Sequence, residues 1–335
     1  MSIISESAVN VIDDVVKLSQ RFAIGCHELA GKVPLCSKLH TKDRFLHPLV
    51  PTLLSPPFGN TQMSFSHAVV VSVPNSLKFA NKKSTLDIDS LRKESEGLVE
   101  TLRESGVAVN EYRIADDSCV SSLFIGDAAV AINGTTILCR PKKPGISHAE
   151  LRRILPSCCH SVQECPETVD GKAVVLEGAD VFFTGREIFV GVRKHGTNFE
   201  GAKAVARVFC DHAVIPIQLS DKAQCLRYYV ALAAPGILAI GTSKEAQNIL
   251  KVLEAEATLR YKIISVEDDE GVNCMLVNKR LIFQRNKTAA KFTPLQSNGL
   301  ELWTVDAADL LKAGSPLARH CFLIMDVKTS KGILS

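Results

Sequence analysis

The sequence shows little excess of charge of either sign, because Lys and Arg total 39 and Asp and Glu total 36 among its 335 residues. It also lacks a basic stripe with interleaved aromatic residues, so the composition gives no reason to expect a nucleic-acid partner. No apolar run approaches the roughly 20 residues that a membrane span needs. These absences leave an ordinary globular protein, expected to have neither a nucleic-acid nor a membrane partner.

Targeting and metal-binding patterns are missing as well. The N-terminal stretch "MSIISESAVNVIDDVV" has no basic region and contains Glu6, Asp13 and Asp14, which argues against a signal peptide or a mitochondrial address. The eleven cysteines therefore indicate free thiols rather than a disulfide framework. The tightest group, "CCHSVQEC" at Cys158 to Cys165, has none of the usual zinc spacings. We expect a cytoplasmic protein with no metal and no other cofactor.

Residues 1–66 differ from the rest of the chain. The pattern predicts an amphipathic helix around Val9 to Leu29, followed by a segment with four prolines between Pro48 and Pro57. Such a density of proline forbids a regular element. We interpret residues 1–66 as an extension or arm, with a partly disordered tail as the alternative, and residues 67–335 as the main domain.

From His67 onward a pattern of strand, strand, helix and strand recurs. Asn133-Gly134 separates two apolar runs in "SLFIGDAAVAINGTTILCR", and this dipeptide supplies the positive φ angles of a tight hairpin. Thr184-Gly185 and Asn278-Lys279 mark two further hairpins. The main domain is therefore predicted to be built from repeated strand pairs, each followed by a helix.

Helix starts support the same repeat. Ser147 and Glu150 have the spacing of a capping box, and so do Thr242 and Glu245. Asn198 is the expected N-cap of the helix in "NFEGAKAVARVF". About five units result, and the first of them lacks an inner strand. The final apolar run, "CFLIMDV", has no partner after it, so we expect it to complete the first unit and close the set into a ring without free edges.

Three of these segments resemble one known family. The stretches "LEGADVFFTGREIFVGVRKHGTN", "APGILAIGTSKEAQNILKVL" and "GDAAVAINGTTILCRP" are similar to segments of dimethylarginine dimethylaminohydrolase, the dimethylargininase of the amidinotransferase superfamily, from about His67 to about Val327. The resemblance implies an α/β fold, a fivefold pseudosymmetric α/β propeller (pentein) of ββαβ modules closed by the C-terminal strand. It also implies a hydrolase that converts an N-methylated arginine to citrulline and methylamine or dimethylamine.

The resemblance also implies which residues would do this chemistry. In the family, carboxylates hold the guanidinium, a cysteine thiolate attacks it, and a histidine moves the protons. Asp127 falls on a carboxylate that meets the guanidinium, and Glu177 on the carboxylate that supports the histidine. The position of the histidine itself is Cys225. A thiol is no ordinary substitute for an imidazole poised near neutral pH.

Other expected positions hold different residue types. Ser121 and Gly126 stand where the family has acidic residues, and the two arginines that hold the substrate carboxylate fall at Ile146 and at His195 or Gly196. Without those arginines the carboxylate of an amino acid would be poorly held, since bidentate pairing fixes it. Arg193 or Lys194 could compensate.

The family's nucleophile can be aligned with either of two residues of this chain. An alignment with a small gap puts it at Cys321, and a gapless alignment puts it at Arg319. If the final strand is regular through this stretch, Arg319 and Cys321 share one face and His320 points to the other. We take Cys321 as the candidate nucleophile, with both alignments open.

Three functional hypotheses follow. One is a dimethylargininase-like hydrolase with weak or no activity, using Cys321, Glu177 and Asp127 on a methylarginine-like small molecule. A second is a catalytically inactive homologue that acts as a binding or regulatory protein, with an unnamed protein partner. A third is altered chemistry, in which Cys225 meets His320 or Cys321 as an exchanged pair or shares a metal ion with Cys321.

Overall fold

The computed structural model describes residues 63–78, 86–143, 145–155, 159, 161–285 and 289–325. The chain divides into two units, residues 1–53 and 54–335, and every described residue belongs to the second. The helix predicted around Val9 to Leu29 and the proline-rich segment after it lie outside the described residues.

Five three-stranded sheets lie within the described ranges, and all five have the same order. In each sheet an inner strand pairs antiparallel with a middle strand, which pairs parallel with an outer strand. The sheets, inner strand first, are β19 (Cys321–Met325), β1 (Phe65–Ser72) and β3 (Ala108–Arg113); β5 (Ala129–Ile132), β6 (Thr135–Leu138) and β7 (Ser161–Glu164); β10 (Val181–Phe183), β11 (Ile188–Val192) and β12 (Val214–Gln218); β13 (Val230–Ala234), β14 (Ile237–Ile240) and β15 (Lys262–Ser265); and β16 (Cys274–Val277), β17 (Arg280–Gln284) and β18 (Glu301–Val305).

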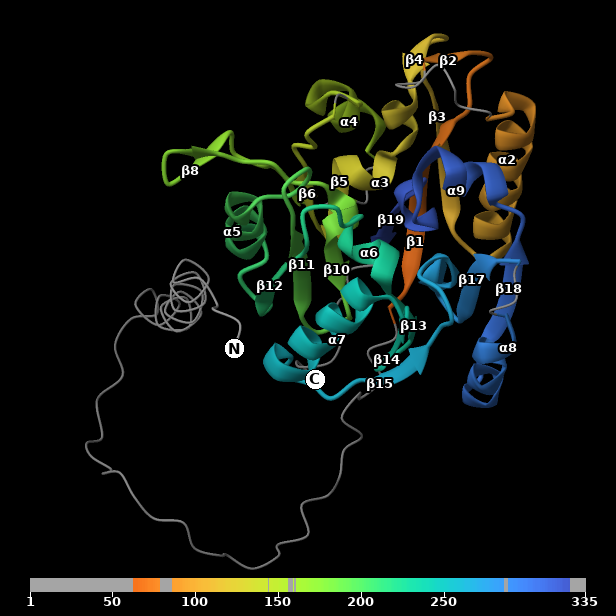
Figure 1. The fold of residues 1–335 in the computed structure, drawn as a ribbon. Helices are drawn as coiled ribbons and strands as arrows, with labels where there is room; N and C mark the ends of the chain where they lie inside the picture. The colour runs from red at the N-terminus through yellow and green to blue at the C-terminus, as the bar shows by residue number, and fades with distance from the viewer. Residues whose placement is uncertain are drawn as a thin grey trace, which may run out of the picture. The chain divides into compact units, whose positions relative to one another are not determined.

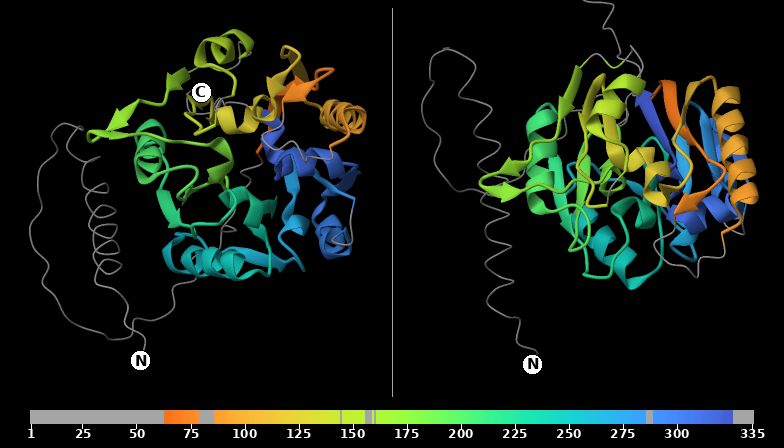
Figure 2. Two further views of the ribbon diagram at one scale, coloured as in Figure 1. Left: turned by 45° about the horizontal axis from the view of Figure 1, so that its top comes forward. Right: turned by 90° about the horizontal axis from the view of Figure 1, so that it is seen from above.

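Helices connect the strands, as expected for an α/β protein. The α-helices are α2 (Ile88–Glu104), α3 (Ile125–Ala128), α4 (His148–Ile154), α5 (Phe199–Val208), α6 (Leu226–Tyr229), α7 (Lys244–Glu256), α8 (Ala289–Phe292) and α9 (Ala308–Gly314). Short 3₁₀ turns are η1 (Val120–Leu123), η2 (Gly178–Asp180), η3 (Glu270–Val272), η4 (Thr293–Asn298) and η5 (Leu317–Arg319), and two small ladders pair β2 (Leu77–Lys78) with β4 (Ser118–Cys119) and β8 (Thr168–Val169) with β9 (Lys172–Ala173). Figures 1 and 2 show the longer helices α2, α5 and α7 lying outside the sheets.

The C-terminal strand completes the first sheet, as the sequence predicts. β19 runs antiparallel to β1, with Cys321 opposite Val70 and Met325 opposite Phe65. The start and the end of the main domain are therefore joined by a strand ladder. Neighbouring sheets also contact one another, β19 with β5 and β13 with β16, and α2 of the first unit contacts β18 of the last.

The predicted hairpins and most of the predicted caps are confirmed. Asn133 and Gly134 have φ angles of 48° and 82° in the turn between β5 and β6. Ser147 and Glu150 form the expected capping box, and the Asn198 side chain accepts a hydrogen bond from the Gly201 N–H.

The capping box predicted at Thr242 and Glu245 is wrong by one residue. Ser243 is the N-cap of α7, and its hydroxyl accepts a hydrogen bond from the Ala246 N–H. Glu245 does not turn back to the cap, because its carboxylate accepts a hydrogen bond from the Ser220 N–H of the preceding unit. Thr242 and Ser243 are both suitable N-cap residues. The contact of Glu245 with Ser220 is compatible with a cap at Ser243, because a cap at Thr242 would need Glu245 for its capping box.

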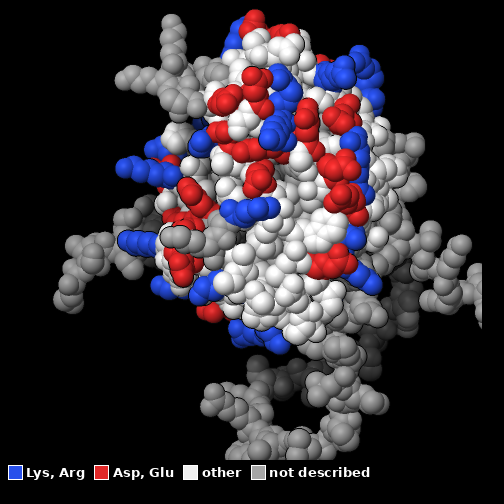
Figure 3. Space-filling view, turned by 90° about the vertical axis from the view of Figure 1, so that its right-hand side faces the viewer, with Lys and Arg blue, Asp and Glu red and all other residues white. Residues whose placement is uncertain are grey.

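The core lies between the helices and the sheets. The buried face of α2 carries Leu91, Leu98 and Leu102, which pack with β1 and β19 in one apolar cluster. Figure 3 shows acidic and basic side chains interspersed over the upper part of one face of the molecule. Among the described residues, no helix has both the length and the apolar character needed to cross a membrane.

Candidate functional site

Helical turns of the same kind precede the inner strands of the sheets. α3 leads into β5, η2 into β10, α6 into β13, η3 toward β16 and η5 toward β19. Because the inner strands lie next to one another, these turns bring residues from distant parts of the sequence to one place. We call the cavity there the carboxylate pocket; its volume is about 90 Å³, and it is lined by Ser121, Phe124, Asp127, Ala128, Pro141, Lys143, Gly145, Ile146, Glu177, Arg193, His195, Gln224, Cys225 and Arg319.

Most of the residues that the sequence singled out meet in this pocket. Asp127 comes from α3, Glu177 immediately precedes η2, and Cys225 immediately precedes α6. Arg319 is the last residue of η5. The positions at which the sequence departs from the expected types, Ser121, Ile146 and His195, line the same cavity.

Asp127 is paired with Arg319 of the same chain. Arg319 Nε lies 2.8 Å from Asp127 Oδ2, and Nη2 of Arg319 donates to the same oxygen. The guanidinium also donates to the carbonyl of Ser315 at 3.3 Å, and its carbon lies 4.4 Å from the centre of the Phe124 ring. Burial lowers the pKa of Arg319, but the charge of Asp127, the hydrogen bonds to it and the charge of Glu177 together outweigh burial and leave this pKa raised. Arg319 therefore keeps its positive charge near neutral pH.

Gly126 makes room for this pair. A Cβ atom at position 126 would lie 2.3 Å from the carbonyl oxygen of Ala318 and 3.0 Å from the Cα of Arg319. The segment that carries Arg319 therefore packs directly on the backbone at Gly126. Any larger residue there, including the acidic residue that the resemblance leads one to expect, requires this segment to move.

A second arginine pairs with two further carboxyl groups. Arg193 Nε lies 3.1 Å and 3.0 Å from the two carboxylate oxygens of Asp180, and Nη2 of Arg193 donates to Glu177. Burial raises the pKa of both the Glu177 and the Asp180 carboxyls, and the charge of Arg193 opposes that shift. A Cβ at Gly196 would lie 2.3 Å from the Arg193 guanidinium carbon. Glycine at this position thus leaves the space that Arg193 fills.

Lys194, the other residue proposed to compensate for a lost arginine, does not enter the pocket. Its ammonium group lies 3.0 Å from Asp221 Oδ2, and both side chains are largely exposed. Arg193 was considered from sequence as a clamp for a ligand carboxylate, but in the structure its charge is matched by Asp180 and Glu177.

Cys225 lines the pocket as a protonated thiol. Its sulfur lies 4.0 Å from the carbonyl oxygen of Ser315, to which the thiol donates. Burial raises the pKa of Cys225 to about 12. At neutral pH a thiol with that pKa is ionised in about one molecule in 10⁵, so Cys225 is a poor nucleophile in this environment.

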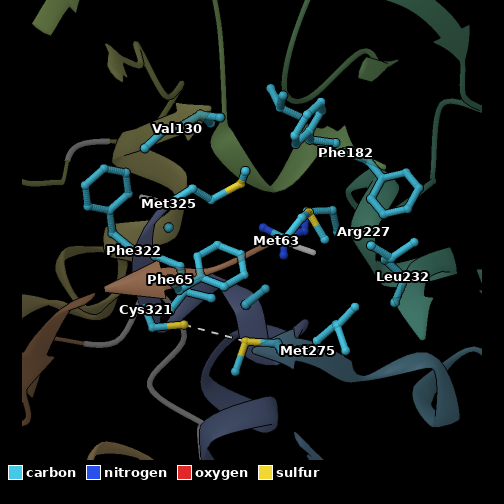
Figure 4. Close-up of a pocket in the computed structure, with 18 of the residues that line it drawn as sticks. Met63, Phe65, Val130, Phe182, Arg227, Leu232, Met275, Cys321, Phe322 and Met325 are labelled. Atoms are coloured by element: carbon cyan, nitrogen blue, oxygen red, sulfur yellow. Dashed lines mark hydrogen bonds between the residues drawn. The ribbon is translucent and has the colours of Figure 1, made fainter. Parts of the chain in front are cut away.

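Cys321 lies elsewhere. It lines a second cavity, which we call the apolar cavity, and its sulfur lies 3.6 Å from the sulfur of Met275 (Figure 4). Burial raises the pKa of Cys321 to about 12 as well. The structure therefore does not bring Cys321 together with Asp127, Glu177 and Cys225.

The expectation that Arg319 and Cys321 share one face of a regular strand is wrong. Residues Leu317–Arg319 form the 3₁₀ turn η5, and β19 begins only at Cys321. Strand alternation therefore does not reach Arg319, which points into the carboxylate pocket. His320 is buried between the two residues, with Nε2 2.9 Å from the Gly314 carbonyl oxygen, and burial lowers its pKa to about 4.

Several residues that line the pocket are not predicted from the sequence, and two of them flank predicted ones. Phe124 packs its ring against the guanidinium of Arg319, and Gln224 lines the cavity beside Cys225. Phe124 directly precedes "IGD", which contains Asp127, and Gln224 directly precedes Cys225. This adjacency in sequence is the one signal that could have predicted them.

Comparison with known proteins places these observations among relatives. No protein-family model matches the chain. A human protein, "Putative hydrolase DDAH2" of Homo sapiens, is 27% identical over 273 residues, which cover 77% of this chain and 94% of that protein. The protein of the same description from Bos taurus is 29% identical over 217 residues, covering 63% and 74%.

Solved structures share the fold. A crystal structure of dimethylarginine dimethylaminohydrolase as an adduct with S-methyl-L-thiocitrulline has a TM-score of 0.62 at 16% identity, covering 77% of this chain and 99% of that one. The N-terminal domain of ArgZ, an arginine dihydrolase of Cyanobacteria, bound to its product, has a TM-score of 0.59 at 15% identity, covering 78% and 97%. The α/β fold expected from the sequence is therefore confirmed by these neighbours.

Proposed function

The chain belongs to the dimethylarginine dimethylaminohydrolase family of the amidinotransferase superfamily, and from this premise we propose that it is a member with little or no hydrolytic activity. It acts by binding, as a regulatory homologue, with Arg319 as an internal competitor for the guanidinium position. The observation that carries the proposal is the ion pair between Arg319 and Asp127.

The first support is the occupancy of the guanidinium position. By its match to the family, Asp127 is the carboxylate that would meet the guanidinium of a substrate. Here a guanidinium of the chain itself binds that carboxylate, stacks on Phe124 and donates to the carbonyl of Ser315. A methylarginine-like molecule would have to displace Arg319, leaving a buried cation unpaired at a cost of about 3 kcal/mol or more.

The second support is the state of the thiols. Cys321 lies in the apolar cavity, and Cys225 lies in the carboxylate pocket. The pKa of each thiol is raised to about 12, so neither supplies a thiolate near neutral pH. The gapless alignment, which puts Arg319 at the nucleophile position, agrees with this arrangement.

The third support is the proton donor. The family position of the histidine is Cys225, and the neighbouring candidate His320 is buried against the carbonyl of Gly314, outside the pocket. His195 does line the pocket, together with Cys225 and Glu177. That trio favours one alternative, a slow hydrolase in which Cys225 is the nucleophile.

An assay of citrulline release separates these functions. The purified full-length chain would be incubated with asymmetric dimethylarginine beside its Cys225→Ala and Cys321→Ala variants. We expect no citrulline above the level given by the double variant. Release that Cys225→Ala alone abolishes would support the slow hydrolase, and release that Cys321→Ala alone abolishes would restore Cys321 as nucleophile; either result would overturn the proposal.

We also infer that the five units are arranged as a fivefold pseudosymmetric propeller, with the preceding residues as an extension; β1 begins at Phe65, so the propeller starts before the predicted boundary at residue 67. The shared strand order and the contacts from each sheet to the next support this arrangement. The free thiols favour a cytoplasmic protein.

A further inference from the structure

The apolar cavity is built by the inner strands of all five sheets. Its lining includes Val130 of β5, Phe182 of β10, Leu232 of β13, Met275 of β16 and Met325 of β19. Its volume is about 130 Å³. Cavities of about 150 Å³ with apolar walls bind molecules of the size of benzene, so this space suits a small organic molecule better than a drug-sized one.

One cation enters this otherwise uncharged space. Arg227 of α6 is the single charged residue in the described lining, and Figure 4 shows its guanidinium directed toward the middle of the cavity, among Met63, Phe65 and Met325. Within the described ranges, Arg227 makes neither a side-chain hydrogen bond nor an ion pair. Burial lowers its pKa, which reflects the cost of holding a cation in an apolar environment.

The ionisable groups near Arg227 do not neutralise it. Cys274 and Cys321 line the same cavity, but burial raises the pKa of each to about 12, so both are uncharged thiols near neutral pH. Among carboxylates, that of Asp127 contributes to raising the pKa of Arg227. It already accepts two hydrogen bonds from Arg319.

Arg227 is half-buried, and a cation without a counter-charge is unusual in such a position, since charges removed from water are normally paired. Its donors are arranged to bind a planar anion such as a carboxylate. The walls around it are aliphatic, aromatic and thioether side chains, which favour an apolar body. The cavity thus has a cationic group at Arg227 and apolar walls that can enclose a short hydrocarbon chain.

We propose that the apolar cavity binds a small monocarboxylate with a short apolar chain, whose carboxylate pairs with Arg227 and whose chain packs against Val130, Leu232 and Met275. This site is separate from the carboxylate pocket and does not depend on whether the protein hydrolyses methylarginines. The apolar chain distinguishes the ligand from an inorganic counter-ion.

Calorimetric titration of the full-length chain with sodium butyrate tests the site, with butyramide as a neutral probe of similar shape and chloride as an inorganic anion. We expect butyrate to bind, and butyramide and chloride each to bind at least tenfold more weakly. Absence of butyrate binding, or equal binding of butyramide, would overturn the proposal. Equal binding of chloride would indicate an inorganic counter-ion only and would overturn it as well.

Variants assign the binding to Arg227. Arg227→Met should reduce butyrate affinity at least tenfold while raising the unfolding temperature of the ligand-free protein, because it removes an unpaired, half-buried charge from an apolar environment. Arg113→Met is the matched control, since Arg113 is exposed at the end of β3, and it should leave both quantities unchanged. Unchanged butyrate affinity in Arg227→Met would overturn the proposal.

A second variant keeps the test independent of Arg227. Val130→Leu narrows the cavity without altering its charge, so it should weaken butyrate more than acetate. Should Arg227→Met fail to fold, this comparison decides alone: loss of the preference for the longer chain supports the site, and equal effects on both anions contradict it.

Discussion

The two cavities differ in whether their arginines are paired. The inner strands line the apolar cavity, and the turns that precede these strands contribute to the carboxylate pocket. In the carboxylate pocket, Arg319 pairs with Asp127, and Arg193 pairs with Glu177 and Asp180. In the apolar cavity, Arg227 has no partner among the described residues. An arginine that is already paired within the chain gains little from an anionic ligand, whereas an unpaired arginine favours one. Both arginines that line the carboxylate pocket are paired within the chain, whereas, within the described ranges, the arginine of the apolar cavity is not.

The change from one cavity to the other takes place within three residues. Arg319 ends the turn η5 and enters the carboxylate pocket, while Cys321 begins β19 and faces the apolar cavity. His320 between them is buried and uncharged. A turn in place of a regular strand separates the two environments.

The largest effect should come from breaking the matched pair. Asp127→Asn leaves Arg319 buried without its counter-charge, and we expect it to lower the free energy of unfolding by about 3–5 kcal/mol. Arg227→Met in the other cavity should not lower it. Urea denaturation of both variants measures the contrast, and a loss below about 1 kcal/mol for Asp127→Asn would show that the pair is not needed in the folded state.

Protonation of His320 should have the next largest effect. Burial lowers its pKa from 6.5 to about 4 in the folded protein, so the unfolded chain binds the proton more readily. The contribution of His320 to the free energy of unfolding is therefore fully present above about pH 6.5. It decreases as the pH falls toward 4, by roughly 3 kcal/mol in total. Unfolding free energies measured from pH 7 to 4 should fall less steeply for His320→Gln. Equal slopes would mean that folding does not lower the pKa of His320.

A smaller effect is expected from closing the space that lets Arg319 approach. Gly126→Ala places a Cβ against the backbone of Ala318, and we expect a loss of about 1–3 kcal/mol. Gly97→Ala is the matched control, because nothing lies within 4 Å of a Cβ at that position of α2, and it should stabilise by about 0.5–1 kcal/mol. Thermal unfolding compares them. Equal effects would argue against the close packing of η5 on Gly126.

Much of the fold could be predicted because its signals are local. The turn at Asn133-Gly134 and the cap at Ser147 depend on a few adjacent residues, and both are confirmed. The pairing of the final strand with β1 followed from counting units, since a free apolar strand needs a partner. The cap at Thr242 was missed by one residue because Ser243 competes with it.

The members of the site were predictable only in part, since Cys321, the predicted nucleophile, lines the apolar cavity instead, and their pairing was not predictable. The resemblance identified Asp127, Glu177 and Cys225, and the structure gathers them. Which arginine meets which carboxylate depends on contacts between segments far apart, such as Arg319 and Asp127. No local pattern distinguishes Arg227 in "AQCLRYY" from a surface arginine, so the apolar cavity could not be foreseen.

The most direct test of the central claim is calorimetric titration of asymmetric dimethylarginine into the wild-type protein and into Arg319→Ala. If Arg319 occupies the guanidinium position, the wild type binds weakly or not at all, and the variant, with Asp127 released, binds at least tenfold more tightly. Binding to the wild type that is as tight as binding to Arg319→Ala would contradict the account.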